Sequence, residues 1–167
     1  MFRNHGVEAL DTSKAEEYLK SVVPPDCTEE EIEKYSKLLS RFVYGDCNVL
    51  IVFGTSSSGK SILTKVVSSF FEHPYVHIAN VQPPAYCDLL IYIEEEEANT
   101  QKFLEGHKSM LVTNKLDDEF LEQSFYDKHH PIYFSLTNTF TEEKVFSNKE
   151  TDEISRQLLV ILGRVTV

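Results

Sequence analysis

The sequence is short of cysteine and of long apolar runs. Its three cysteines, Cys27, Cys47 and Cys87, have no paired metal-site spacing, and their odd number argues against a disulfide framework. No apolar run approaches the roughly 20 residues of a membrane-spanning helix, and the first residues lack the apolar stretch of a signal peptide. We therefore expect reduced thiols and an intracellular protein that does not associate with a membrane.

Positive charge is also scarce. The formal net charge is −11, and the only arginines are Arg3, Arg41, Arg156 and Arg164. A surface this acidic repels phosphate backbones, which excludes a protein that coats nucleic acid over a broad face. Contact through a few placed lysines stays open. With 167 residues and a hydrophobic content of 41%, the chain suits one ordinary soluble domain.

Apolar runs alternate with amphipathic segments along most of the sequence. Runs that are apolar over their whole length indicate strands buried on both faces of a parallel sheet. The expected strands are residues 49–53, 75–78, 89–93, 132–136 and 158–162. Residues 60–71 are expected to form a helix. Strands and helices in alternation predict an α/β fold with a mainly parallel sheet.

Residues 12 to 44 precede the first expected strand and have the pattern of two helices. Ser13 with Glu16, and Thr28 with Glu31, have the spacing of a capping box, and Pro24-Pro25 separates the two segments. We therefore predict a small helical segment over residues 1–44, followed by the α/β core over residues 45–167.

The stretch GTSSSGKS follows the first apolar run and fits the phosphate-binding pattern G-x-x-x-x-G-K-[ST]. Its glycines let backbone N–H groups face a phosphate, and the following helix presents its positive end. We expect Lys60 to neutralise the β- and γ-phosphates and the Ser61 hydroxyl to ligate Mg²⁺. The alternative is a serine-rich loop without a ligand. The predicted nucleotide-binding residues are Gly54, Thr55, Ser56, Ser57, Ser58, Gly59, Lys60 and Ser61.

Polar residues also follow two other expected strands. Glu94 and Glu95 come directly after residues 89–93, where one could hold Mg²⁺ and the other polarise the attacking water. The alternative is that these glutamates begin a helix, because acidic residues suit a helix N-terminus. Asn138 comes after the strand at 132–136, where its amide could orient water against the γ-phosphate; it could also be a turn residue.

These three elements, in this order, resemble the superfamily 3 helicases of small DNA viruses, above all the parvoviral replication proteins. The matching stretches are GTSSSGKS at 54–61, LLIYIEE at 89–95 and PIYFSLTN at 131–138. The resemblance implies a P-loop core of the AAA+ type that hydrolyses ATP with Mg²⁺. It implies metal binding by Ser61 and Glu94, catalysis by Glu94 and Glu95, and sensing of the γ-phosphate by Asn138.

The resemblance also implies partners. Family members place a DNA-contacting lysine on a β-hairpin between the acidic pair and the sensor, a position that Lys108 or Lys115 would take here. Arg156, with Arg164 as the fallback, would correspond to an arginine that precedes a final core strand and reaches a neighbouring subunit's nucleotide. The expected assembly is a homo-oligomeric ring, such as a hexamer, on single-stranded DNA. Residues 1–44 would be its helical collar, and the nucleus is favoured over the cytoplasm.

Two other functions remain possible from the sequence alone. A small P-loop phosphotransferase such as a nucleoside kinase would need basic lid residues, and the middle of the chain contains no arginine. A captured viral ATPase that serves as a binding or scaffold module fits the acidic surface, and the intact phosphate-loop motif suggests that it would still bind ATP.

Overall fold

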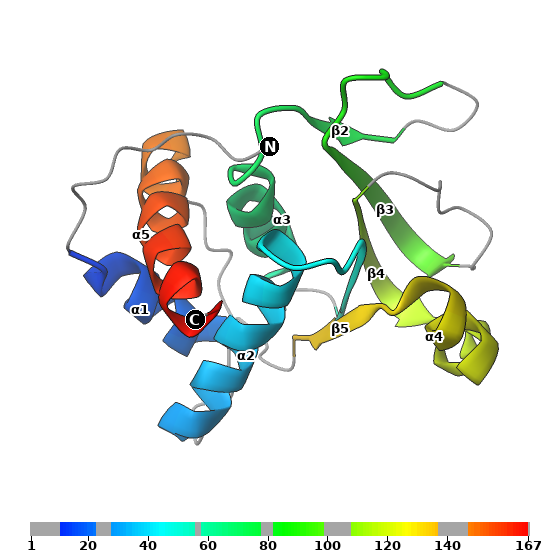
Figure 1. Ribbon diagram of the computed structural model, residues 1–167, viewed down its shortest axis with the longest axis horizontal. Helices are drawn as coiled ribbons and strands as arrows, with labels where there is room; N and C mark the ends of the chain where they lie inside the picture. Colours follow the sequence, from blue (N-terminus) through cyan, green and yellow to red (C-terminus); the bar gives the residue numbers. More distant parts are fainter. Residues whose placement is uncertain are drawn as a thin grey trace.

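The computed structural model describes residues 11–22, 28–55, 58–77, 82–98, 108–136 and 147–166, with the backbone alone for 94–98 and 164–166. Two helices come first along these residues, and strands and helices then follow in mixed order (Figure 1). The elements are α1 (Ser13–Val22), α2 (Glu29–Val43), β1 (Val49–Phe53), α3 (Lys60–Ser68), β2 (Pro74–Val76), β3 (Leu89–Ala98), β4 (Ser109–Leu116), the 3₁₀ helix η2 (Asp118–Leu121), α4 (Gln123–His129), β5 (Ile132–Ser135) and α5 (Asn148–Thr166).

The strands form one five-stranded sheet in the order β2-β3-β4-β1-β5. Every neighbouring pair is parallel, which confirms the predicted α/β class with a parallel sheet. The strand β4 separates β1 from β3. The carboxyl ends of all five strands therefore point to the same edge of the sheet, where β4 lies between β1 and β3.

Side chains alternate between the two faces of the sheet, as a pleated strand requires. Leu50 and Val52 of β1 belong to the larger core, to which α1, α2, α3 and α5 also contribute. Val49 and Ile51 belong to a smaller core with Phe120 and Phe125 of the η2–α4 segment. Figure 1 accordingly shows α1, α2, α3 and α5 on one side of the sheet and α4 at the other.

The two N-terminal helices are part of the larger core. Ala15, Tyr18, Leu19 and Val22 of α1 are buried in it, as are Leu39, Phe42 and Val43 of α2. The ring of Tyr35 in α2 meets the ring of Phe134 in β5 edge to face, with centroids 4.9 Å apart. The predicted helical segment therefore packs on the sheet and on α5.

The helix starts confirm one of the two predicted capping boxes and contradict the other. Thr28 and Glu31 exchange the two hydrogen bonds of a capping box at the start of α2. At the start of α1, Ser13 and Glu16 do not form the predicted box: the Ser13 N–H donates to Oδ1 of Asp11 over 3.0 Å, and the Thr12 hydroxyl donates to the Glu16 carboxylate over 3.2 Å. Ser13 is already the first residue of the helix.

One strand prediction is wrong, and one strand of the sheet was not predicted. Residues 158–162 lie inside α5, because Ile154, Leu158 and Leu162 recur every four residues and are buried as one helical face. The strand that was not predicted is β4, whose apolar stretch at 110–112 is shorter than those of the predicted strands. Within the described residues, none of the helices has the length and apolar character to cross a membrane.

Candidate functional site

The predicted phosphate loop connects β1 to α3, as its chemistry requires. Gly59 has φ 94° and ψ 15°, a left-handed conformation that glycine adopts without strain, and α3 begins at the next residue. Gly54 is tightly packed: a Cβ there would lie 2.6 Å from the carbonyl oxygen of Leu136 and 2.7 Å from Oγ of Ser58. Both glycines of the motif are thus needed for the shape of the loop. Ser56 and Ser57 lie outside the described residues.

Lys60 points back into the loop. Its ammonium group donates to the carbonyl oxygens of Gly54 and Thr55, over 2.8 Å and 2.6 Å, and lies 3.4 Å from Oγ of Ser58. Partial burial lowers the pKa of Lys60 from its ordinary value. The loop thus concentrates one positive charge at its centre.

The N-terminus of α3 has features that fit a bound anion. Its first turn has neither a side-chain cap on the backbone N–H groups nor an acidic residue. Ser61 lies in that turn and is exposed. The N–H groups at a helix start attract negative charge, so a phosphate on this loop would be held by these groups and by Lys60.

Four strands lie level with one another in one row beside this loop, where β1 and β5 end while β3 and β4 continue further. Thr113 of β4 pairs with Phe53 of β1 on one side and with Glu94 of β3 on the other. Phe53 in turn pairs with Ser135 of β5. The backbone N–H of Gly54 donates to the carbonyl of Thr113 over 3.3 Å, which ties the loop to β4. This row places the predicted phosphate loop and the predicted acidic pair at the same edge of the sheet, with only β4 between them.

Thr113 and Asn114, in the second half of β4, are a part of this edge that the sequence did not predict. Thr113 is buried, and Asn114, the next residue, is exposed. Alternation along β4 puts Asn114 on the same face of the sheet as Met110 and Val112, the face that α3 covers. The signal was present in the sequence as the apolar residues 110–112 followed by Thr-Asn, the same pattern as at the other strand ends.

The predicted catalytic residues are placed to different degrees. The backbone of Glu94 lies within β3 in the row described above, Glu95 is the next residue, and the strand continues to Ala98. These residues continue the strand, so the alternative that they begin a helix is wrong. Asn138 lies outside the described residues. Leu136, two positions before it, donates its N–H to the carbonyl of Phe53 over 2.9 Å, beside the loop.

Lys108 is at the other edge of the sheet, where β4 begins. Its ammonium group donates to the carbonyl oxygens of Phe42, of Gly45 over 3.2 Å and of Cys47 over 2.9 Å. It also lies 5.1 Å from the centre of the Phe42 ring, and burial lowers its pKa. Lys108 thus holds the end of α2 to the start of β4, a structural role that the sequence did not predict.

Lys115 and Arg156 are in different surroundings from those that the resemblance implies. Lys115 is exposed, but it lies on a parallel strand that pairs with β3 at Glu97 and not on an antiparallel hairpin. Arg156 lies within α5, beside Ser155, whose hydroxyl donates to the Val66 carbonyl in α3. No strand follows Arg156 in the described residues, so the motif that suggested an arginine finger is absent there. Arg164, the fallback, is also in α5.

Comparison with known proteins supports the fold alone. No protein-family model and no curated protein match the chain. The apo A form of the NrS-1 C-terminal region is similar, with 14% identity and a TM-score of 0.52 over 92% of this chain and 45% of that one. A second structure of that region, residues 305–718, has 13% identity and a TM-score of 0.49 over 87% and 42%, too weak a match to carry an argument. The chain spans less than half of each.

Proposed function

We propose that the chain is an ATPase of the superfamily 3 helicase type, which binds ATP with Mg²⁺ at the loop over residues 54–61. One observation carries this proposal: the loop, with Lys60 at its centre, shares a sheet edge with Glu94 and Glu95, and only β4 lies between them. A phosphate-binding loop beside carboxylates is the arrangement that phosphoryl-transfer chemistry needs.

The residues of the chain would divide the work by position. Lys60 and the N–H groups of α3 would hold the phosphates, and the exposed Ser61 hydroxyl would ligate Mg²⁺ together with Glu94. Glu95 would accept the proton of the attacking water. Asn114 of β4 is on the strand next to Glu94 and Glu95, nearer to them in the strand order than any other described side-chain amide at this edge. We therefore assign Asn114 a water-orienting role alongside the predicted Asn138.

The test is a measurement of ATP hydrolysis by the purified chain, with and without single-stranded DNA. We expect turnover that Lys60→Ala abolishes by loss of binding and that Glu95→Gln abolishes while nucleotide binding is retained. Lys37→Ala, which removes an exposed lysine of α2, is the control and should leave turnover unchanged. Nucleotide binding that is equal in wild type and Lys60→Ala would contradict the proposed site.

The helicase part of the proposal depends on assembly and on DNA. We propose a homo-oligomeric ring in which Lys115 faces the strand and Arg156 acts on a neighbouring subunit. Stimulation of turnover by single-stranded DNA, lost in Lys115→Ala, supports this reading. Sedimentation with a non-hydrolysable ATP analogue tests the ring, and a strictly monomeric result would remove the role given to Arg156.

A scaffold module is the second candidate, and one observation favours it. Lys108 is engaged with three backbone carbonyls, which leaves Lys115 as the remaining predicted DNA contact. Acidic residues follow it at once, at 117–119 and 122. Nucleotide-dependent assembly without turnover would support the scaffold over the helicase.

A further inference from the structure

The order of the strands sets a direction for a nucleotide on the loop. Glu94 and Glu95 lie on the β4 side of β1, and β5 lies on its other side. If the carboxylates act at the γ-phosphate, as in the proposed function on which this inference rests, the γ-phosphate points towards β4 and β3. The ribose and base then extend the opposite way, past the end of β5.

The N-terminal half of α2 borders that side of the loop. Lys108 binds the carbonyl of Phe42, near the end of α2, where the strands begin. In contrast, the Tyr35 hydroxyl donates over 3.4 Å to the carbonyl of Ser135, where β5 ends. The helix therefore runs antiparallel to the strands, and its first turns extend beyond their carboxyl edge (Figure 1).

Ile32 and Tyr35 form the part of α2 next to this edge. Both are partly buried and pack against the larger core. Ile32 is three residues before Tyr35, so it lies about 4.5 Å further beyond the edge along the helix axis. Leu136 connects the two regions, because it directly follows Ser135 and donates its N–H to the carbonyl of Phe53, the residue before Gly54. An aliphatic and an aromatic side chain suit the flat apolar surface of a nucleobase.

We infer that the nucleoside of the bound triphosphate lies on the β5 side of the loop, where its base packs against Ile32 and Tyr35 of α2. This assigns to α2 a part in nucleotide selection, in addition to its packing on the sheet. It also separates two contributions to affinity: the loop binds the phosphates, and α2 binds the nucleoside.

Binding of two probes to the full chain tests this separation: ATP and inorganic tripolyphosphate, each with Mg²⁺, by isothermal titration calorimetry. Tyr35→Leu should weaken ATP binding about tenfold, the size of one base–aromatic contact, and leave tripolyphosphate binding unchanged. Tyr35→Phe, which keeps the ring, should bind ATP as the wild type does. Ile32→Ser should weaken ATP binding several-fold without an effect on tripolyphosphate.

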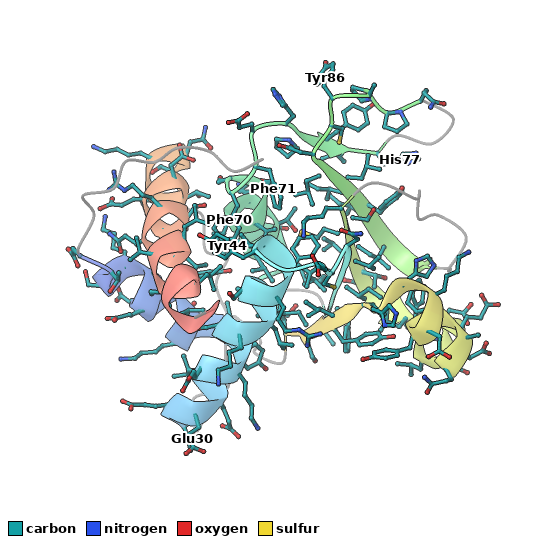
Figure 2. The ribbon with its side chains drawn as sticks, in the orientation of Figure 1. Glu30, Tyr44, Phe70, Phe71, His77 and Tyr86 are labelled. Carbon is teal, nitrogen blue, oxygen red and sulfur yellow. The ribbon has the colours of Figure 1, made fainter. Side chains whose placement is uncertain are left out.

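Tyr44→Leu is the matched control. Tyr44 follows the same helix, and its hydroxyl also donates to a backbone carbonyl, that of Leu159 over 3.2 Å. Figure 2 shows Glu30 at one end of α2 and Tyr44 at the other, so Tyr44 is remote from the expected nucleoside. Both probes should bind this variant normally.

Two results would overturn the inference: unchanged ATP affinity in both Tyr35→Leu and Ile32→Ser, or equal losses for ATP and tripolyphosphate. Failure of the proposed function has a different signature, in which the wild type and Lys60→Ala bind tripolyphosphate equally or not at all.

Discussion

Replacement of Lys108 by methionine is the sharpest test of the way in which this fold is held together. Methionine keeps most of the aliphatic stem and removes the ammonium group, so the packing against Phe42 is largely retained. What is lost is the set of hydrogen bonds to three backbone carbonyls, those of Phe42, Gly45 and Cys47. These carbonyls belong to the segment that leads from the end of α2 to the start of β1, and Lys108 ties this segment to the start of β4.

The magnitude follows from these contacts. Three hydrogen bonds at about 1 kcal/mol net each, with about 0.5–1 kcal/mol for the cation over the Phe42 ring, give a gross loss of about 3.5–4 kcal/mol. Part of this is offset, because burial already lowers the pKa of Lys108 and so penalises its charged form. We expect Lys108→Met to lower the free energy of unfolding by about 2–3 kcal/mol, within the range of broken polar networks.

The assay is urea denaturation followed by circular dichroism, with Lys37→Met as the control. Lys37 is an exposed lysine of α2 whose ion pair with Glu33, at 3.4 Å, spans one helical turn. Its loss should cost no more than about 0.5 kcal/mol. If Lys108→Met is no more destabilising than Lys37→Met, the structural role of Lys108 is refuted. A DNA contact would then again be the better explanation of this lysine.

Three further predictions concern other elements. Gly54→Ala should distort the loop and abolish nucleotide binding, because the new Cβ would meet a backbone carbonyl at 2.6 Å. Gly163→Ala in α5 is the control: its Cβ would meet nothing closer than 4.0 Å, and the variant should be more stable than the wild type by about 0.5–1 kcal/mol. Calorimetry measures nucleotide binding by the two variants, and thermal melts measure their stability. Burial raises the pKa of Tyr18, whose hydroxyl has no hydrogen bond to the described residues. The unfolded chain therefore binds fewer protons than the folded chain above about pH 10, so stability falls as pH rises there; denaturation at pH 8 and pH 11 should show a smaller fall for Tyr18→Phe, and an identical fall would be evidence against the burial. Asn114→Ala should lower the rate of ATP hydrolysis by about 10²-fold with little change in binding, and single-turnover kinetics that show no change would leave Asn138 as the water-orienting residue.

The parts of the fold that the sequence predicted are those set by local pattern. The run 49–53, the glycines of the loop and the helix that follows are contiguous, and each has its own chemical signature. The capping box at Thr28 and Glu31 is equally local. In each case the residues that determine the structure are neighbours along the chain.

The parts that it did not predict depend on residues far apart or on ambiguous patterns. Five apolar residues at 158–162 fit a strand or a buried helix equally well, and only the longer four-residue spacing with Ile154 distinguishes them. The place of β4 in the centre of the sheet is a property of topology, so the apolar residues 110–112 followed by Thr-Asn could suggest a strand end but not its position beside the loop. The contacts of Lys108 with the end of α2 likewise join distant segments.

The insertion of β4 between β1 and β3 also has a consequence for how the chain folds. β1 is made early, yet its hydrogen-bonding neighbours are β4 and β5: Ile51 pairs with Leu111 on one side and with Tyr133 on the other. Until both arrive during synthesis, an apolar strand with two open edges is exposed to wrong pairing. Such long-range parallel pairing slows folding. We therefore expect newly made chains to depend on chaperones, and those that stop before β5 to aggregate.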